Sequence, residues 1–341
     1  MTPTAVILVN YESGDLLRRC LRSVLAQDPP PRTVLVVDND SSDDSLDGLP
    51  EGVRVLRRGT NDGFAAALLA GLAATDEPFV LTLNPDTELL PGCLAAATSA
   101  LARDHGAGAL ALRVLSAADP TRLDASGIGL TSTFSAVNLD HGLREADLDD
   151  TPTTVLGPLG GAALWRRVAL ERAGNFSPRF FLYWEDVDIA LRLERAGYAC
   201  RTCPAARVLH EGSATVGRWS RINVFYMLRN HWPCLVAALP GRVLVRHPLT
   251  LLVAPLRAAV LYALRGRPFT ALWGLVCGAA LVPGAVLMRR RLTRSGSGRR
   301  AAERIATLMR DGDRNRERMR AAGIGGRKVI DTSAPRRDTT R

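Results

Sequence analysis

Two glycine-rich motifs that bind nucleotide phosphates are missing from this sequence. No GxGxxG follows the first apolar run, and no GxxxxGK[ST] occurs in the 341 residues. These absences argue against a dinucleotide-binding fold and against a P-loop NTPase. A nucleotide bound by this protein would therefore have to be held by side chains and a metal ion.

Cysteine is sparse and forms no framework. The chain has 6 cysteines scattered along its length, and a lone CxxC is made by Cys200 and Cys203. Without a second pair, two reduced buried thiols are favoured over a metal or redox site. The first apolar run lacks a preceding cationic segment and is too short for a signal peptide. We therefore expect the body of the protein to lie in the cytoplasm.

Acidic residues are few near the C-terminus. The formal net charge of the chain is +10, and residues 289–341 alone contribute +11, so the remainder is close to neutral. A basic tail suits an acidic surface such as anionic lipid. Nucleic acid is a weaker alternative, because no aromatic residues are interleaved with the arginines. We expect no nucleic-acid partner.

The sequence does contain a series of short apolar runs that alternate with helix-like segments. The expected strands are Ala5–Val9, Thr33–Val37, Val53–Leu56, Phe79–Leu83 and Ala109–Val114, with a strand pair near Tyr198–Leu209. Helices are expected near residues 15–25, 64–74, 92–102, 166–173 and 186–196, and a long loop with short elements at 119–153. Strands that are apolar on both faces are typical of a buried parallel sheet. The pattern predicts an α/β fold with a buried parallel sheet.

The amino-acid composition changes after Cys234. Residues 235–264 are rich in Leu, Val and Ala with interspersed Arg, and Pro268–Met288 carries no charge. The uncharged run has the length of a membrane span, but Pro283 and several glycines interrupt it. We expect helices that lie in the cytoplasmic leaflet, with a true span or a buried helix pair as alternatives. The expected regions are therefore 1–234 (catalytic domain), 235–292 (membrane docking) and 293–341 (a basic, partly disordered tail with one exposed helix).

Polar residues follow each of the first four expected strands. The candidate residues are Asn10 and Tyr11, then Asp38, Asn39 and Ser41, then Asn61 with its neighbours Gly63 and Phe64, and finally Asn84 and Asp86. The carboxyl ends of parallel strands meet at one edge of a sheet, where ligands bind. Asp38 could accept hydrogen bonds from a base or ribose, and Asp86 could help to hold a divalent cation against a diphosphate. Each residue alone could simply form a turn, but four groups at one edge indicate a ligand site.

An acidic cluster follows an aromatic run in "FFLYWEDVDIALR", residues 180–192. Glu185, Asp186 and Asp188 open the expected helix there. Partial burial among aromatic rings would raise the pKa of a carboxyl group and make it a better base. The helix N-terminus would favour the ionised form instead. The sequence leaves open which effect is larger, and a purely structural acidic helix start is the alternative interpretation.

Taken in order, several motifs resemble a known family. They are "VILVNY", "VVDNDSSDDS", "NDGFAAAL", "LTLNPDTEL", "GGAALWRR", "FLYWEDVDIALRLERAGY" and "VLHEGSAT". From Ala5 to Trp232 the chain resembles family 2 glycosyltransferases, and most of all their rhamnosyltransferase-like branch. The resemblance implies a GT-A fold, which is an α/β fold with a mixed, mostly parallel sheet and helices on both faces. It also implies a nucleotide-diphosphate sugar donor, inversion at the anomeric carbon, and Mg²⁺ or Mn²⁺ as the cofactor.

The resemblance also implies roles for individual residues. Asn84-Pro85-Asp86 stands where the family has its DxD metal motif, so Asp86 would be a metal ligand, although Asn84 departs from the pattern. His210 would complete the metal site. Glu185-Asp186 matches the ED motif, which makes Asp186 the general base. The segment Asn61–Phe64 matches the loop beside the nucleotide.

The acceptor side is implied by the residues around the ED motif. Tyr183 and Trp184 could offer a stacking surface to an acceptor sugar, and Arg229 could meet an acceptor phosphate, or simply lie on an interfacial helix. The expected activity is transfer of a sugar such as rhamnose to a lipid-linked or polysaccharide acceptor in cell-envelope glycan synthesis. The alternatives are an inactive nucleotide-sugar-binding partner in a glycan assembly complex and, at lower rank, a nucleotidyltransferase.

Overall fold

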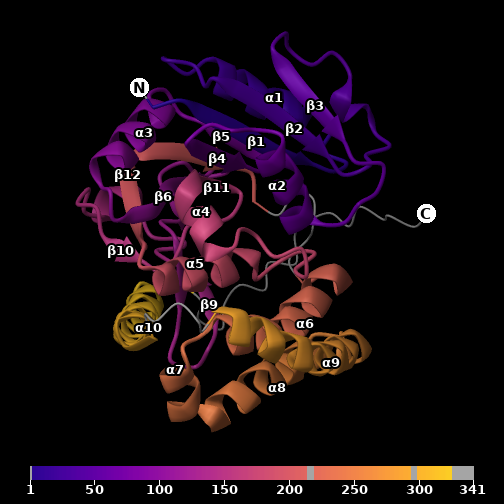
Figure 1. Cartoon of the computed structure of the whole chain (residues 1–341), viewed down its shortest axis with the longest axis vertical. Helices are drawn as coiled ribbons and strands as arrows, with labels where there is room; N and C mark the ends of the chain where they lie inside the picture. The colour runs from indigo at the N-terminus through magenta and orange to yellow at the C-terminus, as the bar shows by residue number, and fades with distance from the viewer. Residues whose placement is uncertain (1, 213–218, 293–297, 325–341) are drawn as a thin grey trace.

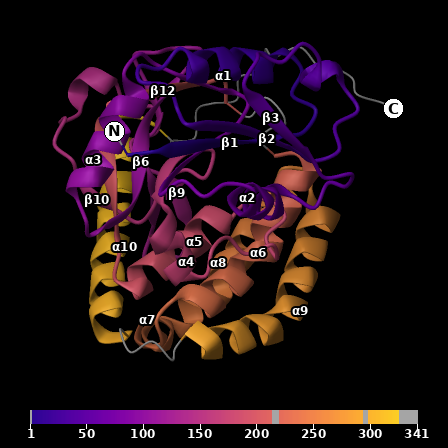
Figure 2. The same cartoon turned by 45° about the horizontal axis from the view of Figure 1, so that its top comes forward.

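The computed structural model describes residues 2–212, 219–292 and 298–324. Its body is a β-sheet with helices on both faces, and the C-terminal helices gather on one side of it (Figures 1 and 2). The strands of the main sheet are β1 (Thr4–Asn10), β2 (Thr33–Asp38), β3 (Val53–Arg57), β4 (Phe79–Leu83), β5 (Thr87–Leu89), β6 (Ala107–Ser116), β7 (Leu123–Ala125), β10 (Thr154–Val155), β11 (Ala162–Arg166) and β12 (Ala199–His210). A small hairpin of β8 (Ile128–Leu130) and β9 (Ala136–Asn138) lies apart.

The sheet is mixed, as the sequence predicts. Its order is β10-β12-β6-β11-β4-β1-β2-β3, with β5 on β12 and β7 on β6. Strands β3, β2, β1 and β4 are parallel, and β11 runs antiparallel between β4 and β6. The register pairs Asn10 with Asp38 and Asp38 with Arg57. The polar residues that end these strands therefore share one edge.

Apolar layers on both faces hold the sheet. The helices of the body are α1 (Asp15–Leu25), α2 (Phe64–Ala73), α3 (Cys93–Arg103), α4 (Arg167–Ala173) and α5 (Glu185–Ala196). Side chains of α1 and α3 join one buried cluster, and those of α2, α4 and α5 join another on the opposite face. Every residue of β1 is buried, which explains its lack of a polar face. This packing fixes the edge at which the polar residues meet.

One expected element differs. The strand pair predicted near Tyr198–Leu209 is a single long strand, β12, whose register with β6 shifts between Cys203 and Arg207. Pro204 lies in this shift, and proline has no N–H for a sheet ladder, so a local bulge satisfies the geometry. Cys200 and Cys203 are free and buried, as expected of structural thiols.

The C-terminal helices do not begin at the expected boundary. Helix α6 (Arg221–Ala238) runs through residue 234 and is followed by α7 (Gly241–Arg246), α8 (Pro248–Leu264) and α9 (Pro268–Leu292). Helix α9 packs on α6 through two glycines: a Cβ at Gly274 would lie 2.9 Å from the carbonyl oxygen of Phe225, and one at Gly278 2.9 Å from that of Arg229. The two backbones are thus in direct contact, which only small residues permit. Residues 268–290 are long and apolar enough to cross a membrane, judged by length and composition alone.

Helix α10 (Gly298–Ala321) corrects the prediction of an exposed helix in the basic tail. Its apolar side chains Ile305, Leu308 and Met309 are buried in a cluster with side chains of α5, β8 and α7. Arg304 on its other flank donates to the buried Glu194 of α5 at 2.7 Å. The helix is therefore part of the folded body. The expected disorder at 325–341 falls outside the described residues.

Candidate active site

The first part of the site is a hydrogen-bond network at the ends of β1 and β2. Asn10 is fully buried, and its Nδ2 donates to Asp38 Oδ1 at 2.8 Å, Ser45 Oγ at 2.9 Å and Ser41 Oγ at 3.1 Å. Asp38 Oδ2 accepts from the backbone N–H of Ser41 at 3.2 Å. Three predicted donor-site residues, Asn10, Asp38 and Ser41, thus form one unit. Tyr11 lies beside them and is exposed.

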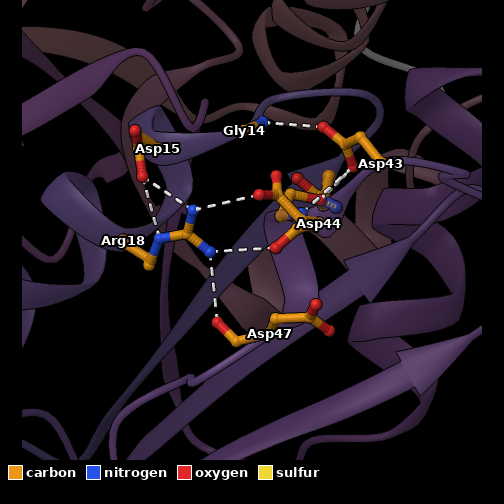
Figure 3. A network of polar contacts seen from close by, with 8 residues as sticks. Gly14, Asp15, Arg18, Asp43, Asp44 and Asp47 are labelled. Atoms are coloured by element: carbon orange, nitrogen blue, oxygen red, sulfur yellow. Dashed lines mark hydrogen bonds and ion pairs between the residues drawn. The ribbon is translucent and has the colours of Figure 1, made fainter.

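The loop after β2 is fastened to helix α1. Gly14 N donates to Asp43 Oδ2 at 2.8 Å, and Arg18 Nη1 donates to the carbonyl oxygens of Asp44 at 2.9 Å and Asp47 at 3.1 Å. Figure 3 shows how the Arg18 guanidinium lies between Asp15 and this loop. The acidic run "DNDSSDDS" is therefore largely structural, and it leaves Asp38 and Asn39 facing the sheet edge.

The loop after β3 touches the turn before α5. Asn39 Nδ2 donates to the Gly63 carbonyl at 3.3 Å, and Asn61 Oδ1 accepts from Gly63 N at 3.0 Å. The backbone N–H of Phe64 donates to the Phe181 carbonyl at 2.7 Å. Asn39 Oδ1 is buried and finds no hydrogen-bond partner in the described parts of the chain. A buried acceptor without a partner at this edge is suited to a ligand N–H.

Asp86 and His210 are brought together by the pairing of β5 with β12, in which His210 lies opposite Thr87. His210 Nε2 lies 3.5 Å from Asp86 Oδ2, and its Nδ1 lies 2.9 Å from Asp124 Oδ2. Burial alone would lower the pKa of His210, but the hydrogen bonds to Asp124 and Asp86 outweigh it and raise that pKa to about 9. The negative charge of the Asp86 and Asp124 carboxylates that raises this pKa also attracts divalent cations.

A divalent cation fits this corner on the chemistry of its donors. Asp86 Oδ1 is buried and has no hydrogen-bond partner among the residues that the structure describes. Over the same residues, no group of three or more His, Cys, Asp or Glu is arranged to hold a metal by itself. Mg²⁺ sites commonly use one or two carboxylates and complete their shell with water and substrate phosphates. The corner thus suits a cation that arrives with a diphosphate.

A double glycine joins this corner to the ED motif. A Cβ at Gly161 would lie 2.3 Å from Asn84 Cγ, and one at Gly160 would lie 3.2 Å from the Phe64 ring and 3.7 Å from Asp186 Cβ. Asn84 N also donates to the Gly161 carbonyl at 2.8 Å. The structure therefore places the end of β4, the start of α2 and the start of α5 around one backbone turn, where a Cβ would displace Asn84 and crowd Phe64.

The two carboxylates of the ED motif differ in exposure. Glu185 is buried, and its Oε2 has no partner in the described chain, whereas Asp186 is half-buried and accepts from Val187 N at 2.7 Å. Burial raises the pKa of both groups, and repulsion from Asp186 adds to the shift of Glu185. Burial thus outweighs the helix N-terminus, which answers the question left open by the sequence. Asp188 is fully buried and pairs with Arg192 at 2.6 Å, as expected of a structural group.

The predicted acceptor residues are in three different environments. Trp184 is only 4% exposed, donates from Nε1 to the Met227 carbonyl at 3.1 Å, and packs edge-on against His231. Its ring therefore offers no open face for a sugar, which corrects its assignment. Tyr183 is half-buried, and Arg229 is half-buried over the Tyr226 ring. Both remain close to the turn that carries Glu185.

The sequence interpretation missed three residues of this site. Asp124 lies in the irregular stretch 119–153 and reaches His210 only because β7 pairs with β6. Ser45 joins the Asn10 network from a short helical turn. Asn230 donates to the backbone of the turn before α5. Ser45 ends the quoted motif "VVDNDSSDDS" and Asn230 follows Arg229, but the sequence analysis singled out neither residue for the site.

Sequence comparisons support the same family. The glycosyl transferase family 2 profile matches residues 5–172. N-acetylglucosaminyl-diphospho-decaprenol L-rhamnosyltransferase of Mycobacterium tuberculosis (strain ATCC 25618 / H37Rv) is 29% identical over 249 residues, which cover 62% of this chain and 77% of the relative. Galactofuranosyltransferase GlfT1 of Mycolicibacterium smegmatis (strain ATCC 700084 / mc(2)155) is 26% identical, covering 62% of this chain and 72% of the relative.

Solved structures support the fold. A mannosyltransferase from Pyrobaculum calidifontis, in complex with GDP-Man and Mn²⁺, superposes with a TM-score of 0.51 at 20% identity. The alignment covers 89% of this chain and 87% of the mannosyltransferase. GalNAc-T7 with UDP, GalNAc and Mn²⁺ has a TM-score of 0.58 at 16% identity, covering 71% of this chain and about half (49%) of its own. These likenesses confirm the predicted GT-A fold. With the motifs, the sheet edge and the sequence matches taken together, residues 5–172 form a glycosyl transferase family 2 domain, and the chain is a glycosyltransferase.

Proposed function

We propose that the protein is an inverting, Mg²⁺- or Mn²⁺-dependent enzyme that transfers a sugar from a nucleotide-diphosphate donor to a lipid-linked or polysaccharide acceptor in cell-envelope glycan synthesis. The observation that carries this proposal is the approach of Asn84 and Asp186 to the same Gly160–Gly161 turn. A diphosphate-side residue and a candidate base then flank one reaction centre. Rhamnose is the favoured sugar because a relative is named as a rhamnosyltransferase.

The donor would bind along the sheet edge. The Asn10–Asp38 unit and the free Oδ1 of Asn39 would meet the base and ribose, while the loop Asn61–Phe64 would cover the nucleotide. Asp86 and His210 would hold the cation, which on binding would offset the charge that develops on the leaving diphosphate. Asn84, in place of a second aspartate, would contribute an amide oxygen instead of a charge.

Asp186 would act as the general base on the acceptor side. A carboxylate with a raised pKa binds the proton of the attacking hydroxyl more strongly than an ordinary one. Glu185 is more deeply buried, and its raised pKa keeps it protonated over a wider range, so it would shape the field around Asp186 without taking the proton. Tyr183 and Arg229 would border the acceptor.

We further propose that the protein acts at the cytoplasmic face of the cell membrane. Large apolar side chains are exposed along α8 and α9, namely Leu249, Leu252, Leu256, Val260, Leu264, Phe269, Leu272, Trp273, Val276 and Leu287. No Asp or Glu occurs between Glu211 and Glu303, while that stretch carries 14 arginines. An apolar face amid arginines suits anionic lipid. An interfacial rather than spanning α9 is favoured because Arg179 Nη1 also donates to the Gly284 carbonyl at 3.0 Å.

Nucleotide binding tests the donor half of the proposal. UDP, dTDP and GDP are titrated into the wild type and into Asp86→Ala, each with and without Mn²⁺. We expect one diphosphate to bind tightly, and the binding to require both Mn²⁺ and Asp86. If no diphosphate binds under any of these conditions, the donor site is not functional as described.

Vesicle binding tests the membrane half. Leu272→Glu/Trp273→Glu is compared with Val168→Glu, which alters an exposed apolar residue on α4 instead. We expect the wild type and the control to sediment with vesicles that contain anionic lipid, and the double variant to stay in solution. Equal sedimentation of all three proteins would refute the docking face.

A further inference from the structure

The turn that precedes the ED motif has an unusual backbone. Tyr183 and Trp184 have φ angles of 65° and 73°, and neither is a glycine. Bulky residues adopt positive φ only where surrounding contacts hold them there. Glu185 and Asp186 follow directly, so the direction in which their side chains start depends on this turn.

Asn230 of α6 supplies contacts that hold the turn. It is fully buried, and its Nδ2 donates to the carbonyl oxygens of Leu182 and Tyr183, each at 2.9 Å. Its Oδ1 accepts from Arg229 Nη1 at 2.7 Å. The same Arg229 nitrogen donates to the Arg179 carbonyl at 3.1 Å. Both ends of the Asn230 amide are therefore used, and its two donors face consecutive carbonyls of the strained segment.

The helix that carries Asn230 is itself held close to the turn. Trp184 Nε1 donates in the opposite direction, to the Met227 carbonyl at 3.1 Å on α6. On its other side, α6 contacts the backbone of α9 through Gly274 and Gly278. Little room remains for α6 to move away, so the position of the Asn230 amide is well determined.

We propose that Asn230 is a positioning residue for glycosyl transfer: by holding the carbonyls of Leu182 and Tyr183, it directs Asp186 toward the acceptor hydroxyl. This inference rests on the proposed role of Asp186 as the general base. Asn230 acts through the turn and not on the reacting atoms. Its loss should therefore slow the chemical step without weakening the donor site, which is built from other strand ends.

The test compares Asn230→Ala and Asn230→Ser with Trp232→Phe in the full-length protein. Serine keeps one donor, and it serves as the milder variant if alanine prevents folding. Trp232 lies on the same helix but donates to the Leu251 carbonyl at 2.8 Å, toward α8 and not toward the turn. Trp232→Phe thus removes one hydrogen bond of α6 and leaves those to the turn intact.

The first readout is independent of activity. Hydrogen–deuterium exchange is followed in the peptide that covers residues 181–188, together with Mn²⁺-dependent binding of UDP, dTDP and GDP. We expect the Asn230 variants to exchange about tenfold faster in this peptide, because two buried hydrogen bonds that restrain it are lost or weakened. Diphosphate binding should not change, and Trp232→Phe should exchange as the wild type does. Unchanged exchange in both Asn230 variants, or equally faster exchange in Trp232→Phe, would overturn the inference.

The second readout separates positioning from a plain loss of stability. With the donor that the wild type uses, we expect kcat to fall by about 10²-fold in Asn230→Ala while the KM for the donor stays constant, since a misplaced base slows chemistry alone. Faster exchange with an unchanged kcat would reject the positioning role. A wild type that transfers no sugar would instead contradict the proposed function, and the exchange comparison would still decide whether Asn230 holds the turn.

Discussion

Replacing Gly63 by alanine tests the contact between the loop after β3 and the turn before α5. Gly63 has a φ of 90°, and a Cβ there would lie 2.3 Å from the Phe181 carbonyl oxygen and 2.6 Å from its Cα. Both are backbone atoms, so the clash can be relieved only by moving the turn itself. Alanine at positive φ costs about 1–2 kcal/mol, and the overpacked contact adds about 1–3 kcal/mol. We expect Gly63→Ala to lose about 2–5 kcal/mol of unfolding free energy.

Gly59→Ala is the matched control for that change. Gly59 also has a positive φ, 71°, but no atom of the described residues lies within 4 Å of the position its Cβ would take. The control should therefore lose only the conformational part, about 1–2 kcal/mol. Thermal unfolding of the two variants and of the wild type, with Mn²⁺-dependent diphosphate binding as a second readout, gives the comparison. Equal losses of stability in the two variants would refute the close approach of Gly63 to Phe181, and with it the joining of the donor loop to the base.

Three further changes follow from the charges and contacts of the site. The transfer rate should rise with pH as Asp186 ionises, and the midpoint of this rise should lie above the ordinary carboxyl pKa of about 4. The reason is that burial raises the pKa of Asp186, which lies beside Glu185 and the Asp188–Arg192 pair. A midpoint at or below about pH 4 in the pH–rate profile would contradict this. Glu185→Gln should stabilise the protein at high pH and have little effect at low pH. The pKa of Glu185 is raised in the folded state, so this carboxyl supports folding at low pH and loses that contribution as pH rises through its folded pKa. Unfolding curves of the variant and the wild type at several pH values check this. Gly161→Ala should weaken donor binding, because its Cβ would overlap the Asn84 side chain and displace it; Mn²⁺-dependent diphosphate titrations would measure the loss, and unchanged affinity would contradict it.

Much of the fold follows from local sequence patterns. Strand β4 has the limits that its apolar run predicts, and strands β1 to β3 differ from the prediction by at most one residue at an end. The runs of β1, β2 and β4 are reliable because these strands are buried on both faces and are apolar almost throughout, whereas β3 is partly exposed. The order of polar residues after these strands then places Asn10, Asp38 and Asn84 at one edge by topology alone.

Other features depend on contacts between distant segments. Asp124 joins His210 through the pairing of β7 with β6, and no local motif marks it. The burial of Trp184 follows from a left-handed turn at two bulky residues, which sequence preferences argue against. The apolar stripe of α10 is visible in the sequence, but the surface that covers it is made by α5, β8 and α7. The site roles of Asp86, His210 and Asp186 themselves stay predictions.

The proposed role of Asp186 as the general base is tested by comparing sugar transfer by the wild type and by Asp186→Asn. Both proteins are given the nucleotide sugars of the diphosphate that binds, an activated rhamnose included, with Mn²⁺ and a lipid extract from bacterial membranes as the acceptor source. We expect both proteins to bind the diphosphate with equal affinity, and the transfer rate of Asp186→Asn to be at least about 100-fold lower than that of the wild type. Transfer by Asp186→Asn at the wild-type rate would contradict the proposed role of Asp186. A wild type that binds the donor tightly and transfers nothing would contradict the proposed activity.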